Sequence, residues 1–308
     1  MDVNAVWIRS AICAAAGALI ALGSGAAQAL TVNPINSSAG IETTLANALL
    51  APGSGITIVP GTLAYQGTNT STFQQSGTYS GFNLAPSSGS TPTLTMSNGI
   101  VLTTGDVNFP LTNTINNFTG ESGSGDNAAL TTLAGESTND ANVLSFSFTV
   151  AAGINALRAQ FVFATDEFPT QAVTDIFGFF VDGVNYAQFS GGELISNTPG
   201  NPTNFISNPV GGGLYGIEYN GLTQVFTVTG LLGAGSEGVH TFSVGVADTS
   251  DTIFDSAVFI SSLTGATAEG GGGIGPVTAV PEPETYALMM AGLAFVGAMA
   301  RRRRAARG

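Results

Sequence analysis

The stretch Leu144-Ser-Phe-Ser-Phe-Thr-Val150 alternates large apolar residues with small hydroxyl residues. Successive side chains of a β-strand point to opposite faces, so one face of this stretch is apolar and the other carries hydroxyl groups. The stretch Leu157-Arg-Ala-Gln-Phe-Val-Phe163 also places large apolar residues on one face, as do residues 226–228 and 242–246. The sequence therefore predicts strands with one buried face.

Three Asn-Gly or Asp-Gly pairs separate short apolar runs. Each pair predicts a tight hairpin, because these residues tolerate the positive φ that a two-residue turn requires. The pairs are Asn98-Gly99, Asp182-Gly183 and Asn220-Gly221. Many short strands with turns between them predict an all-β protein, with an antiparallel β-sandwich or jelly-roll-like domain.

One short N-terminal helix is the exception to the β pattern. It is expected over residues 37–50, where Ile41, Leu45 and Leu49 recur at four-residue spacing on one helical face. The expected N-cap is Ser37 or Ser38, since a serine hydroxyl can accept a hydrogen bond from a free amide of the first turn.

Residues 1–29 have the pattern of a secretory signal peptide. A leading arginine precedes an apolar run over residues 11–22, and the small residues Ala27 and Ala29 fit a signal-peptidase site with cleavage after Ala29. The single cysteine, Cys13, would leave with this segment. The mature protein would then have neither a disulfide nor a thiolate metal site.

The C-terminal end combines three features in a fixed order. A glycine-rich linker over residues 267–279 leads into a segment over residues 280–304 that begins Val280-Pro-Glu-Pro283, continues through an uncharged apolar run and ends in Arg301–Arg304. The run over residues 285–300 is expected to be a single membrane helix, with the arginines on the cytoplasmic side of the inner membrane. The two prolines keep the preceding segment extended, as a protease cleft requires.

This tail resembles the PEP-CTERM signal, in which exosortase enzymes of Gram-negative bacteria recognise a Pro-Glu-Pro triplet beside a membrane helix with a basic end. Pro281, Glu282 and Pro283 occupy the triplet in this chain. The resemblance implies export through the inner membrane and processing by an exosortase. The alternative is a permanent tail anchor with an incidental triplet.

The charge of the mature segment, residues 30–284, is strongly negative. The chain contains no lysine, and only one of its seven arginines, Arg158, lies in this segment. Of the 20 acidic residues only Asp2 lies outside it. The segment therefore contains one arginine and nineteen acidic residues, and its net charge is −18. Such a surface repels phosphate backbones, which excludes nucleic acid as a partner and favours divalent cations.

Two stretches, residues 161–182 and 240–260, concentrate carboxylates where strands run into loops. Hard oxygen ligands of this kind are those that Ca²⁺ takes in groups of six to eight. The candidate ligands are Asp166, Glu167, Asp175, Asp248, Asp251 and Asp255. The alternative is that these residues cap turns by bonding to their own backbone.

The same acidic stretches, together with residues 45–50, 99–106 and 140–144, resemble the bacterial choice-of-anchor L domain family. The resemblance covers most of residues 45–263, within an expected domain over residues 30–266. It implies a secreted module joined to alternative surface-sorting tails, and it supplies no reaction.

An enzyme is the competing class. Asp166 or Glu167 with Asp175 or Asp251 could form the carboxylate pair of a glycan hydrolase, but adjacent strand residues point to opposite faces, so Asp166 and Glu167 do not form such a pair. The only histidine, His240, is expected to be a satisfied residue at a strand edge, and there is no serine triad or histidine cluster. We therefore expect no enzymatic activity.

The phenylalanines of residues 161–180 could stack on sugars, but burial habits favour the core of the sandwich. We expect an exported protein of the cell envelope, cell surface or extracellular matrix with a structural or adhesive role. A calcium-dependent carbohydrate-binding module, with exopolysaccharide as its partner, is the alternative among binding proteins.

Overall fold

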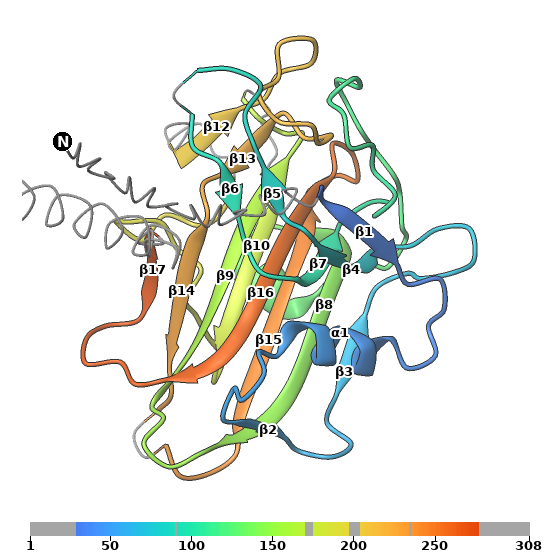
Figure 1. The fold of residues 1–308 in the computed structure, drawn as a ribbon. Coiled ribbons are helices and arrows are strands. Elements are labelled where there is room, and N and C mark those ends of the chain that lie inside the picture. The colour runs from blue at the N-terminus through green and yellow to red at the C-terminus, as the bar shows by residue number, and fades with distance from the viewer. Residues whose placement is uncertain (1–28, 90, 170–174, 197–203, 234–235, 277–308) are drawn as a thin grey trace, which may run out of the picture.

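The computed structural model describes residues 29–89, 91–169, 175–196, 204–233 and 236–276. Two sheets pack face to face in this part of the chain, and all of their strand pairs are antiparallel (Figure 1). The predicted all-β sandwich is confirmed. None of the helices in these ranges could span a bilayer. The predicted signal peptide, apart from Ala29, and the membrane helix over residues 285–300 lie outside the described residues.

The first sheet contains nine of the described strands. Its main path runs in the order β1 (Thr31–Pro34), β4 (Ser76–Ser80), β7 (Gly99–Thr103), β16 (Ser256–Ala266), β9 (Ala156–Thr165), β13 (Gly221–Thr223) and β12 (Phe205–Ser207). The first half of β9 pairs instead with β14 (Phe226–Leu231), which in turn pairs with β17 (Gly273–Pro276). β17 lies within the predicted linker over residues 267–279, so part of that segment extends the sheet.

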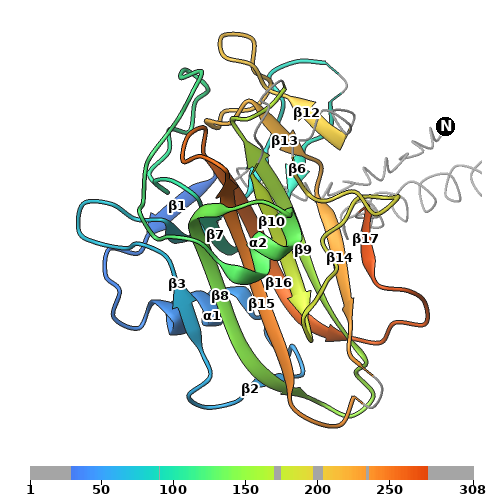
Figure 2. The same cartoon turned by 180° about the vertical axis from the view of Figure 1, so that it is seen from behind.

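The second sheet lies behind the first in Figure 1 and faces the viewer in Figure 2. Its strands follow the order β11 (Val184–Asn185), β10 (Ile176–Val181), β15 (His240–Thr249), β8 (Thr138–Val150) and β2 (Ile56–Ile58), and β3 (Ala64–Gln66) also pairs with β8. A separate two-stranded ladder joins β5 (Asn83–Leu84) to β6 (Leu94–Thr95).

The main core lies between the two sheets. The predicted alternation of β8 holds, because Leu144, Phe146 and Phe148 enter this core while the serines between them are half-buried on the outer face. All the phenylalanines considered as sugar platforms are buried, at no more than 9% exposure: Phe161, Phe163, Phe168, Phe177, Phe179 and Phe180. The core interpretation is confirmed for all of these rings except Phe180, which packs in a separate cluster beneath α2 on the outer face of the second sheet. Burial of each ring stabilises the fold by about 1.5–3 kcal/mol.

The predicted helix is present but shorter than expected. Helix α1 (Ile41–Leu49) packs Ile41, Leu45 and Leu49 into the main core, as predicted. Its N-cap is Gly40 in the left-handed region, so the predicted serine cap is wrong. The hydroxyl of Ser37 instead accepts a hydrogen bond from the amide of Ala39, in the turn before the helix.

A second helix, α2 (Ala128–Ala134), was not predicted and covers part of the outer face of the second sheet (Figure 2). Asn127 caps it by accepting hydrogen bonds from the amides of Ala129 and Leu130, and Gly135 ends it in the left-handed region. The spacing of these two capping residues is the sequence signal from which this helix could have been predicted.

One of the three predicted hairpins is confirmed. Asp182 and Gly183 adopt φ of 50° and 77° and join β10 to β11. The other two predictions are wrong, because Gly99 and Gly221 each begin a strand that pairs with strands distant in the sequence. Close packing explains both glycines. A Cβ at Gly99 would lie 2.1 Å from the carbonyl oxygen of Ile260, and one at Gly221 would collide with the Phe168 ring.

The Gly99→Ala substitution should therefore destabilise the fold by about 1–3 kcal/mol, the usual cost of overpacking. The matched control is Gly275→Ala on β17, where a Cβ would meet nothing within 4 Å. Thermal unfolding of the two variants beside the unaltered chain measures the difference. Equal melting temperatures for Gly99→Ala and Gly275→Ala would contradict the packing explanation.

Candidate functional site

The acidic stretches come together at one end of the sandwich, where β9 and β15 end and β10 and β16 begin. Asp166 and Glu167 follow β9, Asp175 directly precedes β10, and Asp248 lies near the end of β15. Asp255 directly precedes β16. Of the six predicted ligands, all but Asp251 are at most 2% exposed. Below, the carboxyl cluster means Glu167, Asp175, Asp248 and Asp255.

Asp166 is held by backbone amides. Its two oxygens accept hydrogen bonds from the amides of Phe118, at 2.7 Å, and Asn220, at 2.9 Å. Burial nevertheless raises the pKa of Asp166 to about 7. This carboxyl group ties two distant loops to the end of β9, so we assign it a structural role and leave it out of the carboxyl cluster.

Asp175 and Asp248 form the centre of the carboxyl cluster. The Ser256 hydroxyl donates a hydrogen bond to Asp175, while the carboxyl of Asp248 approaches both the Thr104 hydroxyl and the carboxyl of Asp175. Burial and the charge of Asp248 raise the pKa of Asp175 well above its ordinary value. Two carboxyl groups this close cannot both ionise without a cation between them.

Asp255 lies beside this pair, and one of its buried carboxyl oxygens accepts no hydrogen bond from the described residues. One oxygen accepts a hydrogen bond from the amide of Gly120, but Oδ2 has no hydrogen-bond partner in the described ranges. The carboxyl group lies directly against Gly105, where a Cβ would be 1.6 Å from Oδ2. Burial and the neighbouring charge of Asp248 raise its pKa to about 9.

Glu167 and Asp251 complete the acidic region. Burial and then the charges of Asp251 and Asp248 raise the pKa of Glu167 to about 9. Asp251 is half-buried, and its carboxylate accepts a hydrogen bond from the amide of Ile253, as a turn residue does. Asp251 therefore lies at the rim of the region.

Among the described residues, no lysine or arginine lies near these carboxyl groups. Arg158 is the only lysine or arginine in the described part of the chain. It lies near the start of β9, eight residues before Asp166, which corresponds to about 27 Å of extended chain. His240 pairs with Asp182 at 2.8 Å. Within the described ranges, no group of three or more His, Cys, Asp or Glu side chains is arranged so that it could hold a metal ion.

The raised pKa values predict how stability depends on pH. Unfolded carboxyl groups titrate near pH 4. Since the pKa of Asp248 is about 8 and those of Glu167 and Asp255 are about 9 in the folded chain, the folded state binds more protons between these limits. The free energy of unfolding must therefore fall as the pH rises through this window. Without divalent cations, the chain should therefore melt at a higher temperature at about pH 5 than at about pH 8. A higher melting temperature at pH 8 would contradict the raised pKa values of these carboxyl groups.

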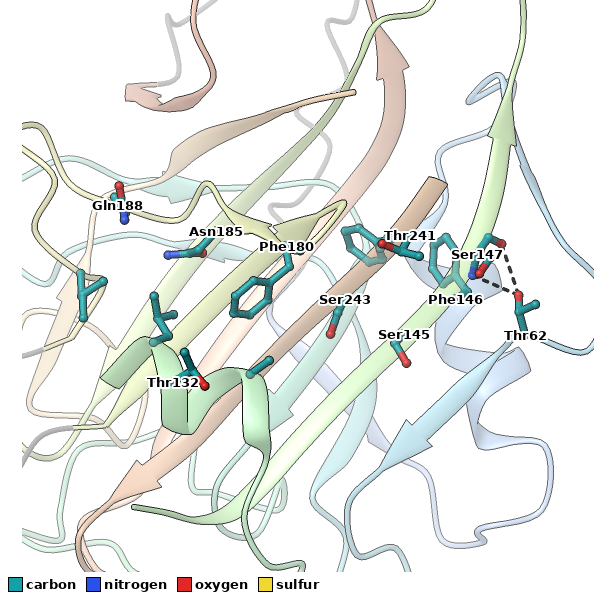
Figure 3. Close-up of a pocket in the computed structure, with 15 residues that line it drawn as sticks. Thr62, Thr132, Ser145, Phe146, Ser147, Phe180, Asn185, Gln188, Thr241 and Ser243 are labelled. Atoms are coloured by element: carbon teal, nitrogen blue, oxygen red, sulfur yellow. Dashed lines mark hydrogen bonds between the residues drawn. The ribbon is translucent and has the colours of Figure 1, made fainter. Parts of the chain in front are cut away.

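A second feature lies on the outer face of the second sheet, beside α2. It is a groove of about 780 Å³ that crosses β8, β15, β10 and β11 (Figure 3). Ser145 and Ser147 of β8 and Thr241 and Ser243 of β15 lie along its floor. No site was predicted here, although the serines of residues 144–150 were expected to point away from the core.

Comparison with known families identifies the domain. Residues 35–264 match the choice-of-anchor L domain, which covers both sheets and both helices except for β1 and the last residues from Gly265 onwards. The chain belongs to the choice-of-anchor L family. No curated protein and no solved structure matches the chain.

The tail of this choice-of-anchor L protein matches a second signal. Residues 279–304 match the PEP-CTERM protein-sorting motif, so the resemblance of Pro281, Glu282 and Pro283 to that triplet is confirmed. The motif makes this an exosortase-sorted protein that is exported through the inner membrane of a Gram-negative bacterium to the cell surface or extracellular space. These residues, and the predicted cleavage site apart from Ala29, lie outside the described residues.

Proposed function

We propose that the exported domain is a non-enzymatic module with a structural or adhesive role at the cell surface or in the extracellular matrix, and that bound calcium secures its fold. The observation that carries this proposal is a set of buried carboxyl groups in a domain with a single arginine. Asp175, Asp248 and Asp255 are close enough for their charges to interact, and each has at least one buried oxygen with no hydrogen-bond partner among the described residues.

Calcium suits this arrangement better than other common divalent ions. Carboxylate oxygens are hard ligands, and Ca²⁺ accepts irregular sets of six to eight oxygens that include carbonyls and water. Mg²⁺ demands a near-ideal octahedron and gives up water reluctantly. Asp175, Asp248 and Asp255 would supply the charge, with Glu167 next to them, and backbone carbonyls or water would complete the shell.

The place of action also supports calcium. Extracellular modules bind this ion with dissociation constants of about 10⁻⁴–10⁻³ M. A domain whose carboxyl groups repel one another without the ion would become fully stable only after export. Such a domain fits a protein that is sorted to the cell surface.

The burial of the acidic residues favours a non-enzymatic role. A glycan hydrolase places two carboxyl groups on either side of an accessible glycosidic bond. Asp175, Asp248 and Asp255 are at most 1% exposed, and the residues that line the groove include no acid.

Proteolysis on intact cells tests surface display and calcium dependence together. With calcium in the medium, an antibody should reach the chain on intact cells and added protease should cleave it slowly. A chelator should accelerate cleavage because the carboxyl cluster then loses its cation. A periplasmic and a cytoplasmic protein serve as controls, since both should stay uncleaved as long as the cells remain intact. A chain that the antibody cannot reach, or that is cleaved equally fast in both media, would contradict the proposal.

A further inference from the structure

The groove beside α2 is open along its length and has a floor of small side chains. Neighbouring strands lie about 4.8 Å apart, so the four strands from β11 to β8 span about 14 Å. Helix α2 contributes Ala129, Thr132 and Leu133 to one wall, and Thr62 lies at the β8 end (Figure 3). The groove is therefore long enough for several units of an extended polymer.

The floor presents hydroxyl groups in register. Ser243 lies directly opposite Ser145, and Thr241 lies opposite Ser147, on the antiparallel strands β15 and β8. Side chains in such positions lie about 4.5–5.5 Å apart at their Cβ atoms. The hydroxyls of these four residues form no hydrogen bond to any other residue that the structure describes. Each can therefore donate to and accept from a ligand.

The walls add amide and apolar groups. Gln188 and Asn185 lie at the β11 end, although the amide of Asn185 is already bonded within its own turn. Phe180 is turned towards α2, over Gly178, and Leu133 and Leu194 lie near it. The apolar contribution is small, because the Phe180 side chain is only 9% exposed.

None of the 15 lining residues carries a charge, although residues 30–284 have a net charge of −18. The groove thus offers a charged ligand no counter-charge. It lies on the face of a sheet, so a peptide could not add to it as a further strand, which requires an exposed edge. An uncharged ligand rich in hydroxyl groups matches what the floor provides.

We propose that this groove binds an uncharged polysaccharide chain, through hydrogen bonds from Ser145, Ser147, Thr241 and Ser243. This inference deepens the adhesive role under the proposed function and rests on it, since the groove must be displayed outside the cell. The lining contains no carboxylate, so calcium does not bridge the sugar. Asp248 lies five residues beyond Ser243, about 17 Å along β15.

An array of soluble polysaccharides tests the assignment. The full chain, purified in a polyoxyethylene detergent that contains no sugar, is applied to neutral glucans, mannans, galactans and xylans and to the polyanions alginate and polygalacturonate. The groove variant carries Ser145→Gln and Ser243→Gln, which fill the floor with larger uncharged side chains. The control is Thr227→Gln, a half-buried threonine on β14 of the other sheet.

We expect binding to at least one neutral polymer and to neither polyanion. Since a net hydrogen bond contributes about 0.5–1.5 kcal/mol, the groove variant should bind about tenfold more weakly or worse, and Thr227→Gln should bind normally. Binding to no neutral polymer, binding to polyanions alone, or undiminished binding by the groove variant would overturn the proposal.

A chelator arm separates this inference from the proposed function. The chain is kept in chelator at a temperature below its melting temperature, and circular dichroism first establishes that it is folded without calcium. Polysaccharide binding should then persist. Loss of binding from a chain that remains folded would overturn the calcium-independent groove, whereas a melting temperature that does not change with calcium would overturn only the calcium part of the proposed function.

Discussion

Replacement of Pro281, Glu282 and Pro283 by alanine should leave the chain in the inner membrane with its C-terminus attached. Within the PEP-CTERM match, this triplet is separated from the apolar run over residues 285–300 by Glu284 alone. Proline disfavours helical backbone at itself and at the preceding residue, which suits an extended protease substrate, and alanine removes both that restriction and the carboxylate. Because recognition precedes release, the expected effect is near-complete loss of the processed form.

Cell fractionation and immunoblotting with an antibody to the domain measure this effect. The unaltered chain should appear as a shorter product at the surface or in the medium, and the alanine variant as the longer form in the inner-membrane fraction. Pro276→Ala is the control, since it removes a proline just upstream of the matched motif. Unchanged release of the triplet variant would mean that the tail is a plain membrane anchor.

Calcium should raise the melting temperature of the full chain, and a chelator should lower it. A ligand that binds only the folded state stabilises it by about 2.7 kcal/mol at a hundredfold excess over its dissociation constant. The effect should grow as the pH rises towards the raised pKa values of Asp248 and Asp255, because the cation then offsets the repulsion among the ionised carboxylates. Magnesium should stabilise the chain less.

Asparagine substitutions separate a calcium site from a general effect of salt. The triple variant Asp175→Asn, Asp248→Asn and Asp255→Asn keeps the size of each side chain but removes its charge. In chelator it should be at least as stable as the unaltered chain, and calcium should no longer raise its melting temperature. Asp126→Asn, at an exposed position, should respond like the unaltered chain. A calcium response that survives in the triple variant would place the ion elsewhere.

The sequence predicts most of the sandwich because its strands follow the two-residue period. In β8 that period places Phe146 in the core and Ser145 outside, and both positions are as expected. It could not predict the strand pairing at Gly99 and Gly221. These glycines resemble turn residues, but they are required by the close approach of Ile260 and Phe168, which lie far away in the sequence.

The acidic region was predictable as a group but not residue by residue. Carboxylates at the ends of several strands indicate an acidic end of a sheet. Which of them share one site depends on the packing of distant loops. The amides of Phe118 and Asn220 bind Asp166 and remove it from the cluster, while the start of β16 places Asp255 near Asp248. No local pattern around residue 166 reveals those amides.

The groove depends on a different kind of information. The alternation in residues 144–150 shows that Ser145 and Ser147 point outwards, but an outward serine is ordinary on a sheet surface. The site becomes visible only when Thr241 and Ser243 are paired with these residues and α2 is placed along one side.

Equilibrium dialysis of the full chain against radioactive calcium tests the central claim most directly. We predict saturable binding with a dissociation constant of about 10⁻⁴–10⁻³ M. Binding should be lost in the Asp175→Asn, Asp248→Asn variant and retained in Asp126→Asn. Absence of saturable binding at millimolar calcium, or undiminished binding by the double variant, would contradict the account of the carboxyl cluster as a calcium site.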